Sequence, residues 1–494
     1  MSDLQEMAEE DLWTALTQAS GRERIDVLFE LANRASSRRD YDRALTLWQE
    51  VESTAAQLGD IGQAATAMRL QGAACFSAGD VDAAVQTYQR AAAAYGEAAM
   101  SRDAASVLWC LADCYRVLGD VEAQLSAAVQ SRELAEFEGE RTVAGDACFL
   151  QARALYLLNR DEEALVVCRA GRDHFRAAER PDLVAVVDDF AVSVHLFLGN
   201  LDEALELARG CLVLANVSSS TADDRYARYR LAEVFLRRGE AEQALGQADQ
   251  ALTAYRQADD FVGAARCEQL RAEAFFERED LPAALEAFAN AWVLFDATGR
   301  DAEGLRCDTR RAVALHYAGD YRQAARTNER LVHAFGQAGD QPAVRWSVVR
   351  WLDNLRQDQQ FEQCRRIAEE HTSLWPPDAT AEDASYREFL GVYSLALEQT
   401  GHVDRATEIA SQVIAQTPAR EASLGTAYCY EVRGRSRLDS DEPGAGQDFS
   451  HAIALHLVQG NTDRARELSQ YFLPANDSLR KHAGDEVPVS PEHG

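Results

Sequence analysis

The sequence predicts an all-α fold in which antiparallel helix pairs stack into an α-solenoid. Three patterns predict it: a glycine-centred turn that recurs at multiples of forty residues, small residues at fixed distances on either side of the turn, and a bulky ring near the end of the second helix. Segments that recur every roughly 20–50 residues are typical of stacked repeat arrays. The stretch 239–280 shows the unit most clearly, as two helical segments with two tight turns.

The turn has the form Gly-Asp/Asn/Glu-apolar-x-x-Ala. It occurs at Gly79, Gly119, Gly199, Gly239 and Gly319, and the intervening positions are filled by Arg39, Asn159, Glu279 and Gln359. A residue with left-handed backbone commonly ends a helix, and glycine adopts that conformation at little cost. We therefore expect each turn to separate the first helix of a pair from the second.

Small residues flank the turn where the two helices would cross. Seven residues before it stand Ala32, Gly72, Ala112, Ala152, Ala232, Ala272 and Ala312, with Val192 and Leu352 as exceptions. Five residues after it stand Ala44, Ala84, Ala164, Ala204, Ala244, Ala284 and Ala324, with Gln124 and Cys364 as exceptions. Small side chains let paired helices approach closely.

Rings follow sixteen residues after the turn, at Tyr95, Phe175, Tyr255, Phe295, Phe335 and Trp375. They are expected to wedge between one helix pair and the next. A single pair cannot bury such a face, so neighbouring pairs must stack.

In these features the chain resembles the tetratricopeptide repeat (TPR) family. The small residue, the Gly-Asp-aromatic turn and the second alanine come in the family's order, and Tyr41 and Tyr321 supply its aromatic after the turn. The resemblance covers about residues 32–418 and implies a right-handed superhelix. The forty-residue period exceeds the usual length of about 34 residues, so it is similar to the long-helix variant of peptide-sensing bacterial regulators and polarity adaptors. HEAT-type repeats share the period, but the small-residue pattern favours TPR.

The predicted domains follow the repeat. Residues 1–20 are expected to form a capping helix and 21–375 the forty-residue array. Prolines at 376–383 interrupt it, because paired prolines end a helix. Shorter, degenerate repeats are expected over 384–473, and a disordered tail over 474–494.

Composition narrows the function classes. The net charge of −31 disfavours nucleic acid and anionic membranes, which need clustered Lys and Arg, and favours a protein or peptide partner of basic character. The N-terminus lacks the features of a secretory signal, no apolar run reaches the length of a membrane span, and the ten cysteines lack paired close spacings. These observations predict a cytoplasmic protein. The capping helix favours a monomer, although exposed end faces leave the oligomeric state open.

Motifs for catalysis are missing from the sequence. It contains no P-loop, no HExxH and no CxxC. Cys110 and Cys114 lie one helical turn apart, but core packing explains them better than metal binding, and His195 occupies a slot filled elsewhere by aromatic residues. We therefore predict neither an enzyme nor a metal or other cofactor.

Function is then expected on the concave groove, which the first helix of each TPR pair lines. The groove slots fall six and three residues before the small residue and one, four and five after it. The residues chosen from these slots are Arg69, Phe76, Trp109, Asp113, Arg116, Phe149, Arg153, Tyr156, Asp189, Tyr226, Tyr229, Glu233, Arg266, Glu273, Phe276, Arg306 and Trp346. The same slots hold Asp146, Phe197, Arg237, His316, Tyr317, Asp353 and Arg356. Aromatic and Arg side chains are enriched in binding hot spots, and the stretch 109–276 is the favoured part.

Two functions remain open from the sequence. One is a non-catalytic scaffold or adaptor that binds a protein segment in the groove. The other is a regulatory protein whose superhelix changes pitch when a peptide or small effector binds. The family's carboxylate clamp for a peptide C-terminus is not clearly present.

Overall fold

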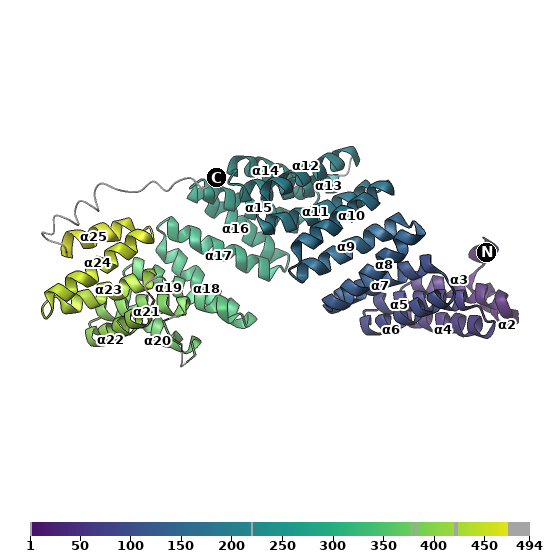
Figure 1. Ribbon diagram of the computed structural model, residues 1–494, viewed down its shortest axis with the longest axis horizontal. Helices are drawn as coiled ribbons and strands as arrows, with labels where there is room; N and C mark the ends of the chain where they lie inside the picture. The colour runs from purple at the N-terminus through teal and green to yellow at the C-terminus, as the bar shows by residue number, and fades with distance from the viewer. Residues whose placement is uncertain (1, 219–220, 377–378, 382, 419–422, 473–494) are drawn as a thin grey trace. The chain divides into compact units, whose positions relative to one another are not determined.

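The structure is a computed structural model, and it describes residues 2–218, 221–376, 379–381, 383–418 and 423–472. Helices joined by short turns make up these residues, which contain no β-strand. Consecutive helices run antiparallel and pack against each other along the chain (Figure 1). The predicted all-α solenoid of stacked helix pairs is therefore confirmed. Two compact units divide the chain, residues 1–254 and 255–494.

The helices of unit 1 begin with two short N-terminal ones and continue with helices of nearly equal length. They are α1 (Ser2–Glu6), α2 (Glu9–Gln18), α3 (Gly21–Ser37), α4 (Tyr41–Gln57), α5 (Ile61–Ser77), α6 (Val81–Glu97), α7 (Ser101–Leu118), α8 (Val121–Glu138), α9 (Arg141–Leu157), α10 (Asp161–Ala177), α11 (Pro181–Leu198), α12 (Leu201–Ser218), α13 (Thr221–Arg237) and α14 (Ala241–Gln257), which contains the boundary.

The helices of unit 2 keep this length as far as α19 and then become irregular. They are α15 (Phe261–Glu277), α16 (Leu281–Ala297), α17 (Asp301–Tyr317), α18 (Tyr321–Ala338), α19 (Gln341–Gln357), α20 (Phe361–His371), the 3₁₀ turn η1 (Thr372–Leu374), α21 (Ala384–Gln399), α22 (Val403–Gln416), α23 (Leu424–Arg437), α24 (Glu442–Val458) and α25 (Thr462–Phe472).

The turns repeat more regularly than the sequence showed. A residue with positive φ stands every twenty residues from 39 to 359, apart from position 219, which lies outside the described residues. These residues are Arg39, Gly59, Gly79, Ala99, Gly119, Gly139, Asn159, Glu179, Gly199, Gly239, Asp259, Glu279, Gly299, Gly319, Gly339 and Gln359. The predicted turns are thus confirmed, including those without glycine. The sequence analysis gave no positions for the alternate turns, which link one pair to the next.

Each turn closes one helix and opens the next. At Gly79 the amide donates to the carbonyl of Phe76 at 3.0 Å, and the following Asp80 amide donates to Cys75 at 3.0 Å. The carboxylate of Asp80 then accepts a hydrogen bond of 3.0 Å from the Ala83 amide at the start of α6. This aspartate satisfies an amide that the new helix leaves free, so a three-residue linker suffices.

The predicted close crossings are also confirmed. Ala112, Ala152 and Ala272 are completely buried. A Cβ atom at Gly72 would lie 2.7 Å from the ring of Tyr88, which is too close for any side chain. The rings Tyr95, Phe175, Tyr255, Phe295 and Trp375 are buried in the core and Phe335 is half-buried.

The domain boundaries proposed for 1–20, 376–383 and 384–473 remain predictions. Positions 377, 378 and 382 of the proline-rich break and the whole tail 474–494 lie outside the described residues. All ten cysteines are free thiols, and nine are buried.

Candidate binding site

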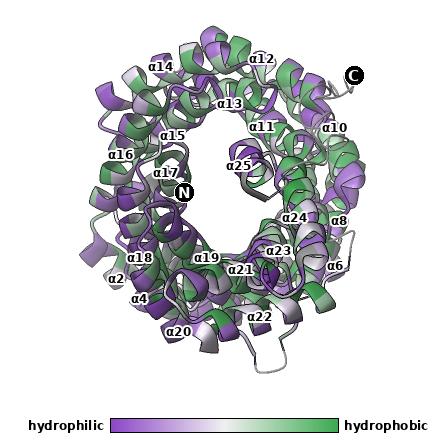
Figure 2. Cartoon of the chain, turned by 90° about the vertical axis from the view of Figure 1, so that its left-hand side faces the viewer, coloured by the Kyte–Doolittle hydropathy of each residue, from purple (hydrophilic) through white to green (hydrophobic). Residues whose placement is uncertain are grey.

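The inner side of unit 2 carries a large cavity. There α15, α17, α19, α21 and α23 lie on the inner side of the curve, and α16, α18, α20 and α22 on the outer side (Figure 2). A cavity of about 830 Å³ opens among α17, α19, α21, α23 and the turn between α24 and α25. Its walls combine aromatic rings with charged and amide side chains.

Two glycines bring the cavity walls together. A Cβ atom at Gly391 of α21 would collide with the backbone of Gly425 in α23, and one at Gly425 would lie 2.6 Å from the carbonyl oxygen of Arg387. Without side chains at these positions α21 and α23 cross in backbone contact. This crossing presents Glu388 and Tyr428 to the same cavity.

A charged pair from α19 forms one wall. Arg356 donates to Asp353 Oδ1 from Nε at 3.0 Å and from a terminal nitrogen at 2.7 Å. Burial raises the pKa of Asp353, but the charge of Arg356 outweighs it and holds that pKa below its ordinary value. The Arg356 guanidinium also lies 4.7 Å from the centre of the Tyr428 ring. Asp353 is therefore ionised and already compensated.

Glu388, the other carboxylate of the cavity, differs from Asp353 because it has no arginine partner in an ion pair. Its Oε2 accepts a hydrogen bond of 2.9 Å from the Gly425 amide, and it has no ion pair with any described residue. Burial raises the pKa of Glu388. Hydrogen bonding to Ser423 and Gly425 and the charge of Arg387 offset part of that rise in pKa, and the negative charge of Asp353 adds to it. The cavity thus contains a partly buried acid that has no ion pair within the described chain.

Two buried polar atoms of cavity-lining residues lack a hydrogen-bond partner within the described chain. They are Tyr428 Oη and Asn328 Oδ1, and both residues are 1% exposed. The Asn328 amide nitrogen donates to the Ala324 carbonyl at 2.9 Å, which leaves the oxygen as a free acceptor. Buried polar atoms are usually satisfied, so these two mark places for water or a ligand.

Two further polar groups of the cavity, His316 and Asn354, have partners within the chain. Nδ1 of His316 lies 2.9 Å from Asn354 Oδ1, and the Asn354 amide nitrogen donates to the Arg350 carbonyl at 2.7 Å. Arg350 lies 5.5 Å from the Trp346 ring centre. Tyr317 is 68% exposed, so the rim offers an accessible aromatic surface.

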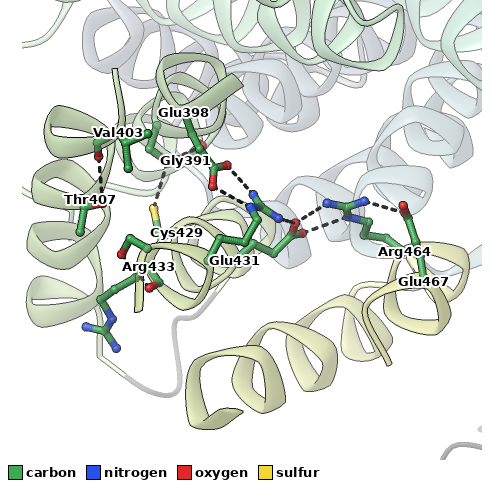
Figure 3. A network of polar contacts seen from close by, with 12 residues as sticks. Gly391, Glu398, Val403, Thr407, Cys429, Glu431, Arg433, Arg464 and Glu467 are labelled. Carbon is green, nitrogen blue, oxygen red and sulfur yellow. Dashed lines mark hydrogen bonds and ion pairs between the residues drawn. The ribbon is translucent and has the colours of Figure 1, made fainter. Parts of the chain in front are cut away.

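A buried ion network anchors α23 behind the cavity (Figure 3). Glu431, which is fully buried, accepts from Arg435 at 3.0 Å and Arg464 Nε at 3.2 Å and lies 2.7 Å from His456 Nε2. Arg435 in turn donates to both carboxylate oxygens of Glu398 at 2.7 and 2.6 Å. The network ties α21, α23, α24 and α25 together and so holds Tyr428, one turn before Glu431, in place.

Of the slot residues from the sequence analysis, five line this cavity: His316, Tyr317, Trp346, Asp353 and Arg356. The cavity lies outside the favoured stretch 109–276. Among the other predicted residues of unit 2, Arg266 and Arg306 are exposed, Glu273 accepts from Arg310 Nε at 2.8 Å, and Phe276 contacts Tyr317 edge-on at 5.6 Å.

The predicted residues of unit 1 form two local clusters. On α9, Phe149 and Tyr156 each contact Phe190 of α11 edge-on at 5.8 Å, and Arg153 lies 5.7 Å from the Phe149 ring centre. Arg153 also lies within the electrostatic reach of the ion pair between Arg116 and Asp113, in which Arg116 Nε and Asp113 Oδ1 are 2.6 Å apart.

The second cluster centres on Asp189 of α11. It accepts a hydrogen bond of 3.0 Å from Tyr226 and pairs with Arg230 at 2.6 Å, and Arg230 also pairs with Glu233 at 2.6 Å. Tyr229 packs 6.2 Å from Tyr226. Arg69, Phe76 and Trp109 are half-buried. Ligand contact by any of these residues remains a prediction.

The sequence analysis missed Asn328, Glu388 and Tyr428. Asn328 lies on a second helix, which the slot rule excludes, and the forty-residue register ends before α21. The glycines 391 and 425 were the available signal, since glycine inside a helix often marks close backbone approach.

Known metal-site and membrane features do not occur in the described part of the chain. It contains no group of three His, Cys, Asp or Glu side chains that could hold a metal ion. None of its helices has the length and apolarity required to span a bilayer.

Fold and cavity together define an α-helical repeat protein. Residues 29–99 and 191–259 match the family model of the tetratricopeptide repeat, so the chain contains TPR repeats, as its resemblance predicted. No curated protein sequence matches the chain at a significant level.

Among solved structures, similarity extends to the apo form of RapI, with 14% identity over 56% of this chain and 98% of that one and a TM-score of 0.47. A Rap protein in complex with competence and sporulation factor has 17% identity over 69% and 91% of the two chains and a TM-score of 0.41. A tetratricopeptide repeat protein from Parabacteroides merdae has 14% identity over 59% and 99%, with a TM-score of 0.39.

Proposed function

We propose that this chain is a non-catalytic interaction protein that binds a segment of another protein, or a free peptide, on the inner side of its helix pairs. The cavity of unit 2 is the main site. The observation that supports this function is the combination of an aromatic rim with buried polar atoms that have no partner in the described chain. Peptide and ligand sites typically pair apolar walls with a few placed polar groups.

Two ionisable groups of the cavity wall already have partners in the chain. Asp353 is held by Arg356 and His316 by Asn354. Acid–base catalysis needs a base free to take a proton and positioned toward a reacting group. In this cavity those groups serve as fixed walls.

A regulatory version of this function is the second candidate. Gln459, Gly460 and Asn461, the turn before the last helix α25, line the cavity. An occupant would therefore contact the turn before α25 as well as α19, and binding would change how the last helices pack.

Selection of peptides displayed on phage tests the proposal. The full chain is compared with Val313→Trp, which places a large ring in the cavity, and with the matched control Ala297→Trp, an exposed position at the end of α16. We expect wild type and Ala297→Trp to enrich the same peptides and Val313→Trp to lose them, with unchanged melting temperatures. Equal enrichment by all three proteins would place binding elsewhere.

A further inference from the structure

We propose that the cavity of unit 2 recognises a basic side chain, Lys or Arg, of the bound segment, with Glu388 as its principal contact. This inference rests on the proposed function and specifies the ligand chemistry of the same site. A cation is the expected group because Glu388, an acid of the cavity wall, has no ion pair among the described residues, whereas the exposed Arg350 lies over the Trp346 ring.

The charged residues of the cavity wall differ in whether they have an ion-pair partner. Asp353 and Arg356 neutralise each other, and Arg350, which also lines the cavity, is exposed beside the Trp346 ring. Glu388 is the acid without an ion pair among the described residues, and the Gly425 amide uses only one of its oxygens. An ionised carboxylate can accept about four hydrogen bonds. A cation of the ligand would compensate this charge where water is largely excluded.

The unpartnered atoms of the cavity point to the same chemistry. Asn328 Oδ1 is an acceptor, and Tyr428 Oη accepts as well as donates. An ammonium carries three donors and a guanidinium five, and neither accepts. A donor-rich cation therefore fits walls that offer carboxylate, amide and phenol oxygens. A ligand carboxylate fits less well, because the Arg356 guanidinium is committed to Asp353.

The rim suits the rest of a basic side chain. Lys and Arg bury their methylene stems on apolar surface while the charged head reaches a polar partner. Trp346 and Tyr317 supply such surface at the cavity. The net charge of −31 also draws basic segments toward the chain as a whole.

Two phage-displayed decapeptide libraries test the inference, one with all twenty amino acids and one without Lys, Arg and His. We expect wild type to recover roughly tenfold more phage from the complete library, the effect of one charge-assisted contact. Glu388→Gln, whose amide oxygen can still accept from Gly425, should bring the ratio of the two recoveries close to one. The matched control Glu277→Gln removes an exposed acid of α15 that does not line the cavity, and it should behave like wild type.

A wild-type ratio near one, or a ratio that Glu388→Gln leaves unchanged, would overturn the assignment of a basic side chain. The proposed function would then still stand if wild type recovers more phage than Val313→Trp. If wild type recovers no more than Val313→Trp from either library, the proposed function fails and this inference with it. A melting curve of each variant shows whether it folds. If Glu388→Gln does not fold, the ratio of wild-type recoveries from the two libraries alone decides whether a basic side chain is recognised.

Discussion

The guanidinium of Arg356 lies 4.7 Å from the centre of the Tyr428 ring, so a residue of α19 and a residue of α23 meet at the floor of one cavity. The ring has a structural partner, whereas the hydroxyl has none in the described chain. The two parts of Tyr428 therefore have separable roles: the ring packs, and the hydroxyl is available to a ligand or water.

Tyr428→Phe should separate them. Because it removes a buried hydroxyl without a partner, we expect the stability to stay the same or rise by up to about 1 kcal/mol, while peptide binding weakens. Thermal melting and phage recovery measure the two effects. In the control Tyr95→Phe, which loses a hydrogen bond of 3.1 Å to Thr66, stability should fall by about 1 kcal/mol. A Tyr428→Phe protein that melts earlier than wild type would contradict this division of roles.

Glu431→Gln should destabilise the last helices of unit 2. The buried carboxylate meets Arg435, Arg464 and His456, and removing one partner of a buried ion pair costs roughly 3–5 kcal/mol. Urea unfolding followed by circular dichroism measures the loss. As a control, Glu163→Gln breaks the exposed pair with Arg160 and should change little. Equal effects of the two substitutions would show that the network does not support the fold.

Acid should weaken the same network. Burial raises the pKa of Glu431, but the hydrogen bonds from His456 and Arg464 and the arginine charges outweigh it and lower that pKa far below the ordinary value. The folded state thus holds its proton less tightly than the unfolded state. Its contribution is complete above the unfolded pKa and is lost as the pH falls toward the folded one. Wild type should lose stability more steeply than Glu431→Gln below about pH 4.5.

Asp146 should show the opposite dependence. Burial raises its pKa to about 6 from 3.8, and the distant charge of Arg180 offsets only part of that. Between these values the folded chain keeps a proton that the unfolded chain has lost, so this group makes stability fall as pH rises. Asp146→Asn should melt like wild type near pH 3.5 and later than wild type above pH 6, by roughly the equivalent of 1 kcal/mol after allowance for its partial exposure. A constant difference across this range would contradict the prediction.

Gln359→Gly should stabilise the turn after α19. Gln359 has a φ of 59°, a conformation that costs a residue with a side chain about 1–2 kcal/mol. Glycine recovers part of this cost after its own entropy loss, so we expect a gain of about 0.5–1 kcal/mol. The reverse change Gly319→Ala, at a φ of 75°, should destabilise by about 1 kcal/mol. Melting temperatures of both variants measure the effects, and a loss on Gln359→Gly would mean that its side chain has a role in the folded state.

The repeat architecture could be predicted because its causes are local. A left-handed residue at a helix end, an aspartate that caps the next helix and a small residue at the crossing each act within a few residues of sequence. Gly79, Asp80 and Gly72 show all three in one repeat. Positions such as Glu279 and Gln359 were predicted as turns without glycine, because they fall in the forty-residue register.

The cavity could be predicted only in part. His316, Tyr317, Trp346, Asp353 and Arg356 follow from the slot rule, because they stand at fixed places on first helices. Glu388 and Tyr428 do not, because the contact between Gly391 and Gly425 that brings them together spans over thirty residues and interrupts the register.

The sequence by itself determined the class of this protein: antiparallel helix pairs, their forty-residue register, the turn within each pair and the small residues at the crossings. Short-range sterics and helix capping decide these features, and both can be read from neighbouring residues. Only the tertiary structure decided which polar groups remain unsatisfied, namely Glu388 without an ion pair and Asn328 Oδ1 and Tyr428 Oη without hydrogen-bond partners in the described chain. Whether two side chains form a hydrogen bond or an ion pair depends on the distance between residues of separate helices. A local sequence pattern does not specify that distance.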